Sequence, residues 1–173
     1  TSLGMVDQLT KQFGISAKEA TDMIAVGMAG GANAADNMAG MISQYSGAFS
    51  DAGISAQEFI GVMAQTESGL FNEQGMSMIT KAGAKIREMS KATADSLDAI
   101  GISSDAMTKA LSDGSMTSME AIQKISEKLR TLSPDTQEYA QVVKNVFGKV
   151  GVQAGSKMIE MLADMDVSID SVV

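Results

Sequence analysis

The chain lacks the residues on which most enzyme and metal chemistry depends. Its 173 residues include no cysteine, no histidine and no tryptophan, and a single proline, Pro134. Without cysteine no disulfide can form, and without cysteine or histidine the usual zinc sites are unavailable. Catalytic triads and general bases built on imidazole are also excluded. The sequence therefore favours a protein that is not an enzyme and that needs no cofactor or metal.

Aromatic residues are also scarce, at 4%, although hydrophobic residues make up 45% of the chain. That hydrophobic content is ordinary for a globular protein and too high for a disordered one. With so few aromatics, the core must be built mainly from aliphatic residues and the fifteen methionines. Methionine is flexible and fills irregular gaps, so such a core specifies its own geometry weakly.

The charge balance narrows the range of partners. The formal net charge is −8, with an isoelectric point near 4.5. The resulting long-range field repels phosphate backbones and anionic lipid surfaces, so no nucleic-acid partner is expected. No stretch reaches the ~18 uninterrupted apolar residues of a membrane span, so membrane contact is not indicated. The chain begins with Thr1 and stops at Val173, and we expect it to be a piece excised from a longer polypeptide.

Apolar residues recur at helical spacing almost everywhere, and strand-like alternation is nearly absent. The run from Met119 to Leu132 is one example, with its apolar residues on one side. Each such helix needs a partner to bury its apolar stripe. The sequence thus predicts an all-α fold, a compact bundle or array of about eight to ten short helices. We expect a single helical domain over residues 1–173, with a weaker division near 90–93.

The tripeptide Gly-Ile-Ser occurs three times. Glycine suits the left-handed position that ends a helix, and serine suits the first cap of the next. Two copies also have glutamate three residues after the serine, which permits a reciprocal capping box, whereas the third has Ala106 there. Each copy therefore predicts a tight corner between two helices. The predicted corner residues are Gly14, Ile15, Ser16, Gly53, Ile54, Ser55, Gly101, Ile102 and Ser103.

The sequence predicts two further helix starts. Asn72 can cap a helix that begins near Glu73. Pro134 follows Ser133, which predicts a helix with serine as its cap and proline at its first position.

The order of parts in the second half of the chain is distinctive. Leu97-Asp98-Ala99-Ile100-Gly101-Ile102-Ser103 is followed by a break at Gly114-Ser115 and by the amphipathic run to Leu132. After Ser133-Pro134 come two further turns, formed by Phe147, Gly148 and Lys149 and by Ala154, Gly155 and Ser156. This order resembles the core region of phage tail tape-measure proteins, with the similarity strongest after Leu97.

The resemblance implies a structural role in tail assembly. In that family the full chain lies inside the growing tail tube, and its length sets the length of the tail. The implied partners are the tube protein, the tail chaperones and the distal tail or tip proteins, and self-association is also allowed. The implied location is the virion tail, with the host cytoplasm during assembly.

Two other kinds of function remain open at this point. Glu67-Ser68-Gly69-Leu70-Phe71-Asn72 resembles the acid-bearing segment of lytic transglycosylases, in which the glutamate protonates the glycosidic oxygen. A peptidoglycan-cleaving module centred on Glu67 is therefore an alternative, although the sugar-binding aromatics and the usual downstream segment are missing. The other alternative is a generic helical protein-binding module.

Overall fold

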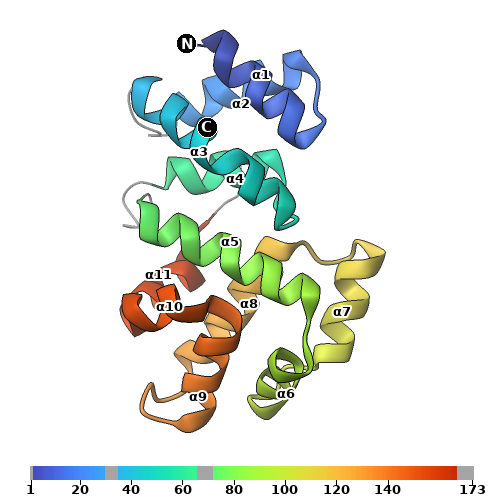
Figure 1. The fold of residues 1–173 in the computed structure, drawn as a ribbon, viewed down its shortest axis with the longest axis vertical. Coiled ribbons are helices and arrows are strands. Elements are labelled where there is room, and N and C mark those ends of the chain that lie inside the picture. The colour runs from blue at the N-terminus through green and yellow to red at the C-terminus, as the bar shows by residue number, and fades with distance from the viewer. Residues whose placement is uncertain (1, 30–34, 66–71, 167–173) are drawn as a thin grey trace. The chain divides into compact units, whose positions relative to one another are not determined.

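The computed structural model describes residues 2–29, 35–65 and 72–166, and every regular element in these ranges is a helix. The predicted all-α fold is confirmed. The chain forms two compact units (Figure 1): unit 1 runs to Phe71 and includes Met165 and Asp166, and unit 2 runs from Asn72 to Asp164. The weaker division predicted near 90–93 lies inside unit 2, and a single domain over residues 1–173 stays a prediction.

In its described residues, unit 1 has four helices, α1 (Ser2–Phe13), α2 (Ala17–Ala29), α3 (Ala35–Asp51) and α4 (Ala56–Ala64). Helix α1 packs against α2 and α3, and α4 packs against the same two helices. The ring of Phe59 lies 5.8 Å from that of Phe13 and 4.7 Å from that of Phe49, between centroids. Because these three rings come from α4, α1 and α3, they tie most of unit 1 together. Buried methionines complete this core: Met5, Met23, Met38 and Met63.

Unit 2 is built around α5 and α8. Helix α5 packs against α7, α8, α10 and a π-helical segment, η2, while α8 packs most extensively against α11. Helix α6 packs against α7, α9 and η2. The elements of unit 2 are α5 (Glu73–Glu88), α6 (Lys91–Ala99), α7 (Ser104–Asp113), α8 (Ser118–Arg130), α9 (Gln137–Val142), η2 (Val143–Phe147), α10 (Gly148–Ala154) and α11 (Ser156–Asp164).

The pairing of α8 with α11 shows how the sequence pattern becomes packing. Ile122, Ile125 and Leu129 fall on one face of α8 and are buried, as is Leu162 of α11. Polar contacts also join α8 to α11. Gln123 Nε2 donates a hydrogen bond to the Leu162 carbonyl at 3.2 Å. An ion pair between Arg130 and Asp164 closes the end of α11. Apolar burial supplies most of the stabilisation, since exposed ion pairs contribute little.

Capping residues begin several helices of unit 2, and one predicted helix start is wrong. Asn72 caps α5, as its Oδ1 accepts from the Gly75 N–H at 2.8 Å. The prediction that Pro134 opens a helix is wrong, because α9 begins at Gln137 and its cap is Thr136. Pro134 instead occupies a turn closed by the Thr136 N–H and the Ser133 carbonyl, 3.1 Å apart. Proline suits the second position of such a turn, and threonine two residues later supplies the cap.

Candidate functional site

The three Gly-Ile-Ser copies lie at three helix-to-helix corners. They join α1 to α2, α3 to α4 and α6 to α7. Gly14, Gly53 and Gly101 all have positive φ, at 67°, 79° and 87°. Residues with a Cβ are strained in this region, so the corners depend on glycine.

Backbone hydrogen bonds close the corners in two ways. At Gly53 and Gly101 the N–H of the following isoleucine donates to the carbonyl five residues earlier, and the glycine N–H donates to the carbonyl three residues earlier. This pair of bonds is the Schellman pattern. At Gly14 a single bond runs from its N–H to the Thr10 carbonyl, 3.0 Å away. Ile54 and Ile102 are buried, whereas Ile15 at the simpler corner is only half-buried. The Schellman corners thus also anchor an apolar side chain.

The serine of each corner caps the next helix. Ser55 and Glu58 form a reciprocal capping box with both bonds at 3.1 Å. Ser16 accepts from the Glu19 N–H at 3.1 Å, and the return bond from the Ser16 N–H is longer, at 3.5 Å. These bonds satisfy amide groups that would otherwise be unpaired at the helix start.

The third corner lacks the glutamate, and an aspartate from the preceding helix binds the residue after the capping serine. Ser103 Oγ accepts from the Ala106 N–H at 3.1 Å. The Asp98 carboxylate then accepts from the Ser104 N–H at 2.8 Å and from the Ser104 hydroxyl at 3.1 Å. Asp98 therefore belongs functionally to this corner, although the tripeptide pattern did not include it.

The turn at Phe147, Gly148 and Lys149 joins η2 directly to α10. Phe147 is buried, and Gly148 has φ 68° and ψ −162°, which redirects the chain with no intervening loop. A Cβ on Gly151 would lie 2.2 Å from the Phe147 Cβ, so α10 approaches η2 more closely than any other residue would allow. The second turn, at Ala154, Gly155 and Ser156, ends α10 at Gly155 with φ 86° and leads into α11.

The π-helical segment is held in place by α6. The buried Thr93 hydroxyl donates to the Asn145 carbonyl at 3.4 Å, and Asn145 Nδ2 donates to the Ala92 carbonyl at 3.2 Å. Such segments are rare inside helices and often occur at functional positions. No repeating pattern in the sequence predicts this π-helical segment.

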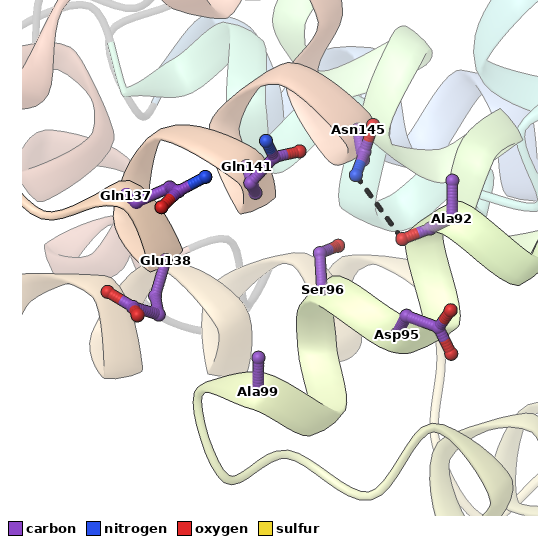
Figure 2. Close-up of a pocket in the computed structure, with 8 residues that line it drawn as sticks. All are labelled: Ala92, Asp95, Ser96, Ala99, Gln137, Glu138, Gln141 and Asn145. Atoms are coloured by element: carbon purple, nitrogen blue, oxygen red, sulfur yellow. Dashed lines mark hydrogen bonds between the residues drawn. The ribbon is translucent and has the colours of Figure 1, made fainter.

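A hollow of about 430 Å³ lies between α6 on one side and α9 together with η2 on the other. Figure 2 shows the amide side chains of Gln137, Gln141 and Asn145 along one side and small side chains of α6 along the other. Ser96 lines this hollow, but its hydroxyl donates to the Thr93 carbonyl at 2.8 Å. The surface can hydrogen-bond to a polypeptide, and it holds no arrangement of nucleophile and base.

Glu67 lies outside the described residues, so the lytic alternative has no described geometry. In the part of the chain that the structure covers, carboxylates do not gather into a group that could hold a metal ion. Nor is any described helix both long and apolar enough to cross a membrane.

Comparison with known proteins identifies a family. Residues 1–148 match the model of the family described as phage-related minor tail protein. The match includes the three corners and ends at Gly148, so most of α10 and all of α11 lie beyond it. Neither the comparison with curated proteins nor that with solved structures found a match. Since the family match spans most of the 173 residues, the chain belongs to the phage-related minor tail proteins and has a structural role in a phage tail.

Proposed function

We propose that the chain is part of a tail tape-measure protein, lies in the lumen of the tail tube and helps to set tail length. The family match supports a phage tail role, and the order of parts from Leu97 to Leu162 favours the tape-measure protein within it. Its partners are then the tube protein, the tail chaperones and the distal tail or tip proteins.

The observation that carries this proposal is the near-continuous helix of the described chain. Between the helices that the structure describes, α9 runs directly into η2 and η2 into α10, and the other interhelical connections after α5 range from one residue, Gly155, to six, 131–136. A helix advances about 1.5 Å per residue, so a chain made almost entirely of helix has a length proportional to its residue number once its corners open. Each of the three Gly-Ile-Ser corners turns on one glycine, and the hydrogen bonds that close it are local.

The experiment changes the length of this segment in the intact phage gene. Deleting the codons for residues 72–164 should shorten the tail by up to roughly 140 Å, and duplicating them should lengthen it by a similar amount, measured by electron microscopy of assembled tails. A matched control replaces the segment with an unrelated helical sequence of equal length, which should leave tail length unchanged. Tails of unaltered length after both the deletion and the duplication would contradict the proposal.

A further inference from the structure

Figure 1 shows the chain turning sharply from α5 into α6, and the residue at this corner is Met89. Met89 has φ 44° and ψ 59°, and its N–H donates to the Lys85 carbonyl at 2.9 Å. In the described part of the chain it is the one residue other than glycine with a positive φ. Residues with a Cβ are disfavoured in this region, so contacts elsewhere must hold the corner bent.

The sequence across this corner favours a continuous helix. Residues 85–95 contain neither glycine nor proline, and most of them are good helix formers such as lysine, glutamate, methionine and alanine. Helical dihedrals at Met89 and Ser90 would join α5 and α6 into one helix over residues 73–99, about 40 Å long. In the bent form Ser90 Oγ caps α6 by accepting from the Thr93 N–H at 3.2 Å. In a continuous helix, backbone carbonyls would accept from this N–H and from the two before it.

Helix α6 is held in the fold by few apolar side chains. Its buried residues are Thr93, Ser96 and Leu97, of which only the last is large and apolar. The hollow of about 430 Å³ leaves its packing against α9 and η2 incomplete. Helix α7 buries only Ser104 and Met107 of its own residues, and the connection between α6 and α7 adds two buried isoleucines. The two helices can therefore leave their places together at a modest loss of apolar burial.

Two hydrogen bonds between Asn145 of η2 and the first turn of α6, which we name the Asn145 latch, hold α6 in place. The Asn145 carbonyl accepts from the Thr93 hydroxyl at 3.4 Å. Asn145 Nδ2 donates to the Ala92 carbonyl at 3.2 Å, as Figure 2 shows. Both bonds reach α6 within four residues of Met89, so they depend on the direction in which the chain leaves this corner. The latch therefore favours the bent form over the straight one.

We propose that the Met89–Ser90 corner is a conformational switch, in which α6 either packs on η2 or continues α5 as one straight helix. Release of the Asn145 latch lets Met89 leave the left-handed region, and the two helices then join. The glycine corners differ, because glycine is at ease in the bent form and weakens a continuous helix. The α5–α6 corner should therefore open before them when unit 2 is pulled or confined. This switch concerns the conformation of unit 2 and does not depend on the length-setting role.

The absence of cysteine allows the switch to be followed by a distance. Gln74→Cys and Ala99→Cys place two spin labels at exposed positions near the far ends of α5 and α6. One straight helix would put them on the same face, about seven turns or about 37 Å apart, and the bent corner brings them closer together. In the otherwise unchanged chain, pulsed electron paramagnetic resonance should show the long distance in about 10% of the molecules or fewer. Thr93→Val together with Asn145→Ala, which removes both latch side chains, should raise the fraction above that level.

Met89→Gly and Met89→Ala form a matched pair in this latch-free background. Both remove the methionine side chain, and they differ only in the Cβ, which disfavours the bent form and favours the helix. The ratio of straight to bent molecules should be about tenfold lower for Met89→Gly than for Met89→Ala. Equal ratios in the two variants, or the short distance alone in every sample, would overturn the proposal. A broad spread of distances with a loss of helical circular dichroism would also overturn it, because α6 would then unfold instead of continuing α5.

Discussion

At the scale of single residues, the backbone conformation of glycine decides where the chain can turn. Gly14 and Gly40 make a matched pair, because a Cβ at either position would meet nothing within 4 Å. Gly14 has φ 67°, whereas Gly40 lies within α3. Substitution at these two sites therefore isolates the effect of the backbone from that of packing.

We predict opposite effects for alanine at these positions. Gly14→Ala should lower the free energy of unfolding by about 1–2 kcal/mol, because alanine is strained in the left-handed region. Gly40→Ala should raise it by about 0.5–1 kcal/mol, because alanine loses less backbone entropy in a helix. Urea denaturation of both variants gives the two values, and a loss of stability in Gly40→Ala would show that α3 is not helical there.

Tyr139 should make the free energy of unfolding depend on pH in the alkaline range. Burial raises its pKa above the ordinary value near 10, with a smaller effect of Glu160, so the folded protein holds its phenolic proton more tightly than the unfolded chain does. The free energy of unfolding should accordingly be unaffected below about pH 9 and fall as the pH rises through 10 towards the folded pKa. Tyr139→Phe should remove this loss.

Absorbance at 295 nm in the Tyr45→Phe background follows Tyr139 alone, since the chain has only two tyrosines and no tryptophan. The midpoint of the titration should lie above 10, and Glu160→Gln should lower it by part of the shift. A midpoint at or below 10 would rule out the buried environment described for this ring.

At the scale of helices, the corner between α6 and α7 differs from the other two in its capping. Asp98 accepts from the N–H and hydroxyl of Ser104, one residue after the capping serine, whereas the glutamates at the other corners accept from the N–H of the capping serine itself. Asp98→Ala should cost about 1–2 kcal/mol, because it leaves the Ser104 amide and hydroxyl without that acceptor. Ala106→Glu should add a few tenths of a kcal/mol to about 1 kcal/mol in either background, because its carboxylate would complete a capping box with the N–H of Ser103 and not with Ser104.

Thermal melting of the two single variants and the double variant tests this assignment. The gain from Ala106→Glu should be about the same in the Asp98→Ala background as in the parent chain, because the two carboxylates accept from different amides. A gain confined to the Asp98→Ala background would mean that the two carboxylates compete for the same amide.

Local chemistry made the helices and corners predictable, while other features depended on packing. The glycine, serine and asparagine signals act within a few residues, so Gly53, Ser103 and Asn72 could be read from the sequence. Met89 could not, since it ends α5 at φ 44°, a conformation that a pattern search assigns to glycine or asparagine. The π-helical η2 also depends on a distant partner, Thr93.

The candidate sites were less predictable than the fold. The hollow beside α6 and a second, apolar hollow lined by Tyr139, Val143 and Ile159 arise from which helices meet, and no spacing in the chain encodes that. Pro134 shows the same limit at short range, because both Ser133 and Thr136 can cap a helix and only the folded chain selects Thr136.

At the scale of the whole molecule, the two units have different compositions and separate cores. Residues 72–164 hold eleven of the thirteen basic residues, so most of the net negative charge belongs to unit 1. Buried methionines occur in both units, which gives each its own set of spectroscopic probes.

We expect a core substitution in unit 1 to leave unit 2 folded. Phe59→Ala removes the central ring of the aromatic cluster and should cost about 3–5 kcal/mol in unit 1. In methyl NMR spectra, signals of Met23 and Met63 should lose dispersion before those of Met76 and Met119. Simultaneous loss of all four would show that the units unfold as one cooperative body.

The corners also bear on how quickly the chain can fold. Their hydrogen bonds join residues no more than six positions apart, so forming a corner closes no long loop and costs little loop entropy. Low contact order of this kind is associated with folding in microseconds to milliseconds. Helix pairs joined in this way can form one after another, in chain order, without waiting for distant segments of the chain.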